Sequence, residues 1–365
     1  MATAASVTKV HRGKRVRSGR WLPRRSRQEW FVRLAVTASF IALGFGIVTF
    51  TLAQVMKGDA PRAYLLAPYD GRLTAGLAAQ LGSGEADDRH RRQADALART
   101  ALRQDPAAVA AAGVVGLNAQ VRGDLAGARR AFAYAETLSR RDSITQMWAI
   151  EDAVARGDVS GAMQHYDIAL RVNPKLGGLL FPVLAAASSV PAVQSELVRT
   201  LAARPLWADS FVNFAAVGNG TDPRAIAVLF QRLGRSGMTL PEAALAALTQ
   251  TLYENGRVDQ AWAFYASFRR GVSRDQSRDP RFAARLDAPT PFDWVINRDN
   301  GVVGAIEGGG FEFSAPSGIG GAMLRQIQLL PNGTYRISGH SVDIGRADGA
   351  RPYVMFACLN GRELG

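Results

Sequence analysis

The stretch GDLAGARRAF at residues 123–132 returns in altered form as GDVSGAMQHY at residues 157–166. Five pairs of identical or similar residues share one offset of 34 positions: Gly123 and Gly157, Asp124 and Asp158, Gly127 and Gly161, Ala128 and Ala162, and Phe132 and Tyr166. A fixed period of this length is typical of chains built from stacked helical hairpins, in which each hairpin covers the apolar face of the next. The sequence therefore predicts a helical repeat array, an architecture that holds partners.

The segment AMQHYDIALRVNP at residues 162–174 indicates what each repeated residue does. Ala162 and Ala169 allow two helices to cross closely, and Tyr166 fills the gap to the next hairpin. Pro174 ends the helix, and Gly157 accepts the left-handed conformation that the turn before it requires. An alanine, an aromatic residue four positions later, a second alanine and a closing proline resemble the tetratricopeptide repeat.

The same frame recurs along the chain with decreasing fidelity. The signature residues of the three best copies are Gly123, Ala128 and Phe132, then Gly157, Ala162, Tyr166 and Pro174, then Gly256, Ala261 and Tyr265. Weaker copies contain Ala94, Ala101 and Pro106, and Gly220, Ala225 and Leu229. The resemblance implies a tetratricopeptide-type solenoid over residues 57–285, and a general alanine-rich helical bundle is the alternative.

An uncharged segment, LAVTASFIALGFGIVTFTLA at residues 34–53, precedes the repeats. As a helix it is about 30 Å long, which is the thickness of the hydrocarbon core of a bilayer. The sequence therefore predicts a single transmembrane helix over residues 34–56. A buried globular helix is one alternative, although such helices seldom run this long without a polar face. A cleavable signal peptide is the other, because Thr51-Leu52-Ala53 fits a small-residue cleavage site.

The net charge of +13 is concentrated before this segment. Residues 1–33 contain ten Lys or Arg and one acid, Glu29, which gives +9 and leaves +4 for the rest of the chain. The positive-inside rule then predicts a basic cytoplasmic tail over residues 1–33, an inner (plasma) membrane anchor, and a periplasmic location for the rest of the chain. In this position the tail is expected to contact anionic lipid, and we expect no nucleic-acid partner.

Near residue 288 the chain changes from alanine- and leucine-rich helix to glycine-rich strands. The predicted strands are residues 293–296, 310–314, 323–330, 334–338 and 353–358. The dipeptide Asn332-Gly333 predicts a tight hairpin turn between two of them. These strands predict an antiparallel β-sandwich over residues 288–365, either a small one or one that continues beyond residue 365. The stretches PNGTYRISG and YVMFACLNG resemble jelly-roll carbohydrate-binding modules. Together with the helical repeats, the predicted sandwich makes the predicted fold class an α+β multidomain chain.

The motifs of common catalytic, metal and cofactor sites are missing from the sequence. The four histidines are scattered, and no HExxH, CxxC or phosphate-binding loop occurs. His165 and Asp167 stand two positions apart in a predicted helix and therefore point to different faces. We expect no catalytic residue, no metal site and no cofactor.

Two surfaces remain as expected binding sites. The groove of the solenoid is suited to an extended peptide or a partner helix. Aromatic residues of the predicted sandwich are expected to form a platform for sugar rings, unless they belong to its core: Trp294, Phe311, Phe313, Tyr335 and Tyr353. The expected function is that of a membrane-anchored scaffold that binds protein partners of an envelope complex in exopolysaccharide assembly or export. A glycan-binding or glycan-processing accessory subunit and a purely structural spacer are the alternatives.

Overall fold

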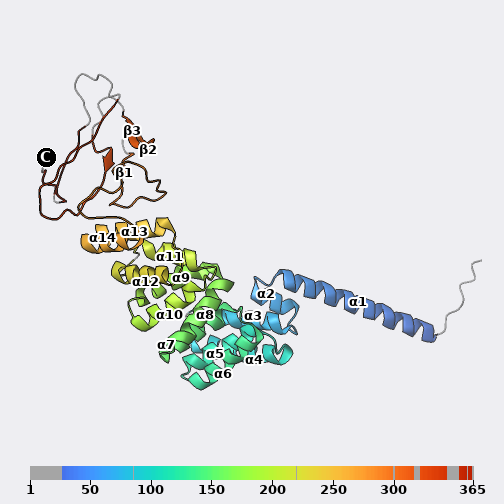
Figure 1. Ribbon diagram of the computed structural model, residues 1–365. Coiled ribbons are helices and arrows are strands. Elements are labelled where there is room, and N and C mark those ends of the chain that lie inside the picture. The colour runs from blue at the N-terminus through green and yellow to red at the C-terminus, as the bar shows by residue number, and fades with distance from the viewer. Residues whose placement is uncertain are drawn as a thin grey trace, which may run out of the picture. The chain divides into compact units, whose positions relative to one another are not determined.

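A computed structural model describes residues 27–84, 86–218, 220–298, 301–315, 321–342, 353–359 and 361–363 (Figure 1). This part of the chain contains fourteen α-helices, one short 3₁₀ helix and four short antiparallel strands. The chain forms two compact units, Met1–Leu176 and Gly177–Gly365, and their boundary falls inside the predicted repeat region 57–285. The mostly helical body is thus confirmed, whereas most of the predicted basic tail, residues 1–26, lies outside the described residues.

Helix α1, Arg27–Val55, contains the whole uncharged segment 34–53 and projects from the rest of its unit (Figure 1). Ser39, Thr49 and Thr51 are accommodated in it, because their hydroxyls donate to carbonyls about one turn earlier, as Thr51 Oγ1 does to Ile47 O at 2.8 Å. Among the described residues it is the one helix long and apolar enough to cross a membrane. The predicted apolar helix is therefore confirmed in its length and composition.

The rest of the first unit consists of short helices, most of which begin at aspartates. These helices are α2 Ala60–Leu66, α3 Gly71–Leu81, α4 Asp88–Gln104, α5 Val109–Val121, α6 Leu125–Leu138, α7 Ser143–Ala155 and α8 Val159–Val172, and the 3₁₀ helix Pro174–Leu176 follows. Six of them have an aspartate N-cap whose carboxylate accepts a backbone N–H of the first turn: Asp59, Asp70, Asp87, Asp124, Asp142 and Asp158. Each cap satisfies donors that would otherwise lack a partner, which fixes where the helix starts.

The repeat period is visible in the helix boundaries themselves. Helix α7 begins and ends 34 positions after α5, and α8 begins and ends 34 positions after α6. The joints between hairpins keep the same period, because Asp105, Ser139 and Asn173 each follow a second helix at successive steps of 34. Each of these three side chains accepts the backbone N–H two positions further on, at 2.9, 3.2 and 3.3 Å. Helices α3–α8 are therefore three helical hairpins with one repeated joint.

The alanine and aromatic signature residues of the first unit are buried on its second helices. Ala128 and Ala162 are both buried, and Ala128 of α6 packs in one cluster with Ala119 of α5. The ring of Phe132 lies so close to Gly116 that an added Cβ there would come within 2.6 Å of it. Phe132 on α6 also stacks on Trp148 on α7, with ring centroids 4.3 Å apart. The repeated aromatic residue thus fills the space between one hairpin and the next, as the sequence predicts.

Glycines with positive φ stand between the two helices of three hairpins. The φ angles are +79° at Gly123, +71° at Gly157 and +71° at Gly256. A side chain in this left-handed region would meet its own following carbonyl, which is why glycine is favoured there. The predicted role of Gly157 is therefore confirmed.

The second unit begins with six further helices. They are α9 Gly177–Ala187, α10 Pro191–Ala202, α11 Ala208–Ala216, α12 Pro223–Arg235, α13 Glu242–Glu254 and α14 Val258–Phe268. Positive φ angles follow α10, α12 and α14 at Arg204, Gly237 and Gly271, at steps of 33 and 34 in the numbering. A period close to that of the first unit thus continues, although the joints here are left-handed turns.

Four strands follow α14, and they differ from the prediction. Strand β1 is Val295–Ile296, β2 is Val303–Glu307, β3 is Gly310–Ser314 and β4 is Leu324–Arg325. Among the described residues they form two two-stranded antiparallel sheets, β1 with β4 and β2 with β3, in place of the predicted sandwich. Of the five predicted strands, only residues 310–314 have their predicted bounds.

The predicted hairpin at Asn332-Gly333 is wrong. The tight turn lies instead at Gly308-Gly309, whose φ angles of +64° and +83° suit a two-residue hairpin between β2 and β3. Within the part of the chain that the structure describes, residues 334–338 form no strand, and residues 353–358 contribute one isolated bridge, between Ala357 and Glu363. The β2–β3 pair has five residue pairs in register, so the backbone groups that face the partner strand are paired across the hairpin.

Candidate binding surfaces

The first helices of two hairpins each expose one narrow stripe. Helix α5 is largely buried, but Ala110, Leu117 and Val121 are exposed along one side of it. The positions one period later on α7 are exposed as well, and they hold Ile144, Glu151 and Ala155, next to the exposed Val154. Spacings of seven and eleven positions place these side chains on one helix face. We call the exposed residues 110, 117, 121, 144, 151, 154 and 155 the first-helix stripe.

A hollow lies at one end of this stripe. It has a volume of about 450 Å³ and is lined by Arg72 and Ala75 of α3, residues 107–110 at the start of α5, and Leu138 at the end of α6. Arg72 is an exposed cation held by Asp105, with Nε 3.0 Å from the Asp105 carboxylate. The lining of the hollow is small and apolar apart from Arg72, and the stripe adds apolar side chains and the acid Glu151.

A polar contact joins three helices of the same unit. His165 Nδ1 on α8 lies 2.8 Å from Gln146 Oε1 on α7, and 3.9 Å from Glu136 on α6. Asp167 accepts instead from Arg171 Nε at 2.8 Å. His165 and Asp167 therefore have different partners, as their spacing predicts.

The five aromatic residues of the expected glycan platform make different contacts in the structure. Phe311 and Phe313 on β3 stack on each other with ring centroids 5.6 Å apart, and Phe313 is 41% exposed. Trp294 instead packs on Phe282 and donates its indole N–H to the carbonyl of Asp279 at 3.1 Å. Tyr335 donates to the carbonyl of Pro331, and Tyr353 is 84% exposed.

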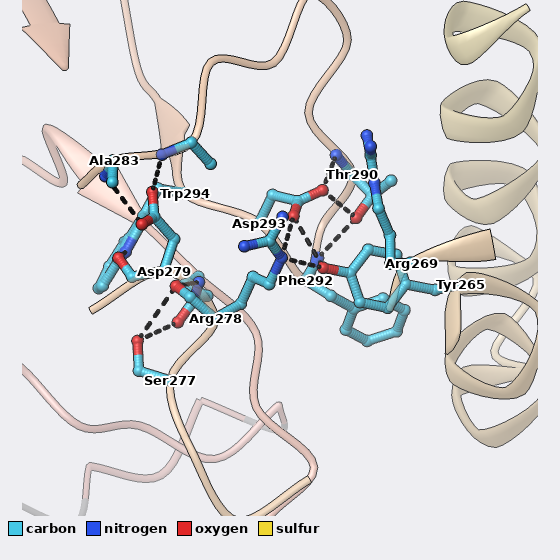
Figure 2. Close-up of polar contacts among 12 residues, drawn as sticks. Tyr265, Arg269, Ser277, Arg278, Asp279, Ala283, Thr290, Phe292, Asp293 and Trp294 are labelled. Atoms are coloured by element: carbon cyan, nitrogen blue, oxygen red, sulfur yellow. Dashed lines mark hydrogen bonds and ion pairs between the residues drawn. The ribbon is translucent and has the colours of Figure 1, made fainter. Parts of the chain in front are cut away.

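Trp294 belongs to a segment that a buried carboxylate holds to the last helix (Figure 2). Asp293 is 1% exposed, and its Oδ1 accepts the hydroxyl proton of Tyr265 on α14 at 2.8 Å. Its Oδ2 accepts the backbone N–H and the hydroxyl of Thr290 at 3.0 and 2.8 Å. Arg278 compensates the charge, because its Nε lies 3.5 Å from Asp293 Oδ1 and donates to the Tyr265 oxygen at 3.1 Å. We call these four residues the Asp293 network.

The Asp293 network is structural. Both carboxylate oxygens accept from internal donors, so the carboxylate is committed to the fold and not to a substrate. Burial, followed by the nearby Asp293 charge, raises the pKa of the Tyr265 hydroxyl well above its usual range, which keeps it a hydrogen-bond donor. Tyr265, predicted as a repeat signature residue, therefore also anchors residues 277–297 to α14.

The described residues contain no group of three or more His, Cys, Asp or Glu side chains that is arranged to hold a metal ion. His90 stands at a helix start, where its ring nitrogen lies 2.8 Å from Asp87. The His90 backbone N–H and then its ring lower the pKa of the Asp87 carboxyl, which is the ordinary effect of an N-cap.

Sequence reasoning missed the two most informative features of this chain. The first-helix stripe has no residue signature, because its equivalent positions hold different chemistry, such as Leu117 and Glu151. The Asp293 network joins residues from three separate segments, and only an aspartate next to Trp294 in an apolar stretch hinted at it.

Comparison with known proteins adds no identification. No protein-family model matches the chain, and no curated protein matches it. The surfaces and contacts described above are therefore what supports a function.

Proposed function

We propose that this chain is a single-pass membrane protein whose helical repeats, of the tetratricopeptide type, hold protein partners of an envelope complex outside the cytoplasm. The N-terminal tail lies in the cytoplasm in this proposal, next to anionic lipid. The rest of the chain lies in the periplasm and acts in the assembly or export of a surface polysaccharide. The polysaccharide part of the proposal follows from the architecture, a membrane anchor joined to a repeat array.

The observation that carries the proposal is the first-helix stripe. The alanine and aromatic signature residues are buried between helices, whereas the stripe is exposed at positions that are equivalent one period apart. Exposed apolar side chains, Leu117 and Val121 on α5 and Val154 on α7, are the kind of surface that a partner segment covers. The neighbouring cation Arg72 favours a partner with an acidic residue at that end.

Affinity capture of the full-length protein from a detergent extract, followed by mass spectrometry, tests this function. The double variant Val121→Glu/Val154→Glu places two charges on the stripe, so we expect it to lose the captured envelope proteins. Ala133→Glu is the matched control, because residue 133 is exposed on the second helix α6. Equal capture by the wild type, the stripe variant and the control would rule out the stripe as the partner surface.

A second candidate function, glycan binding, is favoured by one observation. The stacked pair Phe311 and Phe313 leaves Phe313 accessible on a short hairpin, and sugar rings pack on such faces. Affinity electrophoresis in gels that contain bacterial polysaccharide tests it with the full chain. Glycan binding is supported if the wild type is retarded, Phe313→Ala is not, and Tyr353→Ala still is. If the wild type migrates unchanged in gels with every polysaccharide, glycan binding is excluded.

A further inference from the structure

The apolar helix α1 continues into the repeat unit through a built joint. Gln54, in the last turn of α1, donates its side-chain N–H to Asp70 Oδ2 at 3.1 Å. Asp70 is also the N-cap of α3, where its Oδ1 accepts the backbone N–H groups of Arg72 and Leu73 at 2.8 and 3.2 Å. One carboxylate therefore connects the end of α1 with the beginning of the repeats.

The joint has its own small apolar core. Ala53 of α1, Ala63 and Ala67 at α2, and Leu73 of α3 form one buried cluster. The first three are alanines with no exposed surface, so the backbones of α1 and α2 approach closely. Gln104 of α4 adds a hydrogen bond to the carbonyl of Pro68 at 2.9 Å. The orientation of α2 relative to α1 is thus fixed by packing and by hydrogen bonds.

This fixed arrangement leaves two large side chains of the segment after α1 uncovered. Leu65 is 77% exposed and Tyr69 is 60% exposed, although both belong to the tightly packed segment 60–70. Tyr69 lines a shallow hollow of about 720 Å³ together with residues of α1 that include Gly46, Ile47 and Phe50. Figure 1 shows α2 beside the end of α1 from which the repeats continue.

The position of Tyr69 along α1 gives its depth if α1 crosses a bilayer. Ala53 is the last residue of the uncharged segment, and Phe50 and Gly46 precede it by three and seven positions. At 1.5 Å per residue, Tyr69 lies about 5–10 Å below the end of that segment. This is the depth at which interfacial helices bury their apolar side chains, and the boundary region where tyrosine is enriched.

We propose that residues 60–70 are a second membrane-binding element, which inserts Leu65 and Tyr69 into the outer boundary of the bilayer and seats the repeat unit on the lipid surface. This inference rests on the proposed membrane anchorage of α1. The ligand is the lipid headgroup and upper acyl region, and the exposed Lys57, which stands between α1 and α2, adds a cation for anionic headgroups. A seated unit keeps its binding surface at a set height above the membrane.

Spin-label accessibility in the full-length protein, reconstituted in vesicles of phosphatidylcholine and phosphatidylglycerol, tests the proposal. In a Cys358→Ser background, single labels are placed by Leu65→Cys, Tyr69→Cys, Ile47→Cys and Arg140→Cys. Ile47 reports the apolar part of α1, and Arg140 reports exposed surface just after α6. We expect the labels at residues 65 and 69 to be more accessible to oxygen than to a water-soluble nickel reagent, as we expect for the label at residue 47. The label at residue 140 should be more accessible to the nickel reagent than to oxygen.

The other outcomes separate the two claims. If the label at residue 47 is exposed to lipid and the labels at residues 65 and 69 are exposed to water, the second membrane contact is overturned and the membrane anchorage of α1 still stands. If the label at residue 47 is exposed to water, the membrane anchorage of α1 is overturned, and the second membrane contact is overturned as well. Shielding of 65 and 69 from both reagents would also overturn the proposal, since a protein chain would then occupy the hollow.

Discussion

A single glycine decides whether each hairpin turn forms without strain. Gly157 has a φ angle of +71°, and a Cβ added to it meets nothing within 4 Å. The cost of Gly157→Ala is therefore purely conformational, and we expect it to lower the free energy of unfolding by about 1–2 kcal/mol. Thermal unfolding followed by circular dichroism measures this loss.

Gly113 provides the matched control for this substitution. It lies inside helix α5, where a Cβ also meets nothing within 4 Å. Alanine is the better helix former, so Gly113→Ala should raise the free energy of unfolding by about 0.5–1 kcal/mol. No loss of stability with Gly157→Ala would contradict the left-handed assignment of Gly157.

The Asp293 network gives the second unit a dependence on alkaline pH. The pKa of Tyr265 is raised in the folded chain, by burial first and then by the Asp293 charge, whereas an unfolded tyrosine ionises near pH 10. The folded state therefore holds the proton more tightly, so this contribution to stability is complete below about pH 10 and declines as the pH rises above it. Urea unfolding between about pH 8 and pH 11 should show this decline.

Tyr265→Phe isolates this contribution. The variant removes the hydroxyl that donates to Asp293, and we expect it to lower the free energy of unfolding at about pH 8 by about 1–3 kcal/mol. It should also flatten the decline above pH 10. Tyr335→Phe, which removes a more exposed hydroxyl, serves as the control. An alkaline decline of equal steepness in Tyr265→Phe would show that this residue does not cause it.

At the scale of helices and strands, the interfaces between helices carry the repeat. Ala162 is buried on α8, the second helix of the α7–α8 hairpin, so Ala162→Trp overpacks its surroundings and should cost about 1–3 kcal/mol or more. Ala133→Trp, at an exposed position of α6, should cost little by comparison. Melting midpoints of the full-length protein in detergent measure both, and an unchanged midpoint for Ala162→Trp would contradict the repeat register.

The sequence predicted helices better than strands for a physical reason. The register of Ala128, Phe132, Ala162 and Tyr166 reflects packing within and between neighbouring hairpins, which repeats locally. A strand needs a partner from elsewhere in the chain, and local signals do not identify it. Asn332-Gly333 satisfied the local rule for a hairpin, yet the paired strands flank Gly308-Gly309.

The candidate surfaces were less predictable than the fold. Buried positions are constrained by the neighbours that they touch, which is why the signature residues were recognisable. Exposed positions such as Leu117 and Glu151 are free of that constraint, so equivalent sites differ in chemistry. The residues of the expected aromatic platform had only their location in predicted strands in common. In the structure, Trp294 contacts Phe282.

At the scale of the whole molecule, charge should set the orientation of the chain across the membrane. Ten basic residues and one acid precede the uncharged segment, while residues 56–72 after it carry three basic and two acidic side chains. The positive-inside rule then predicts an N-terminus in the cytoplasm, with α2 and the repeats on the other side of the membrane. A reporter enzyme that is active only outside the cytoplasm should therefore be active when fused after Gly82, and inactive when fused before residue 30.

The same pair of fusions tests the causal role of the tail. Replacement of Arg12, Lys14, Arg15, Arg17 and Arg20 by Ser lowers the tail charge by five, which should reduce activity of the Gly82 fusion because orientation becomes mixed. An N-terminal tag that stays on the membrane-bound protein would distinguish a retained anchor from a cleaved signal peptide. Reporter activity only in the fusion before residue 30 would reverse the topology, place the repeats in the cytosol, and remove lipid contact in the outer leaflet as a role for Leu65 and Tyr69.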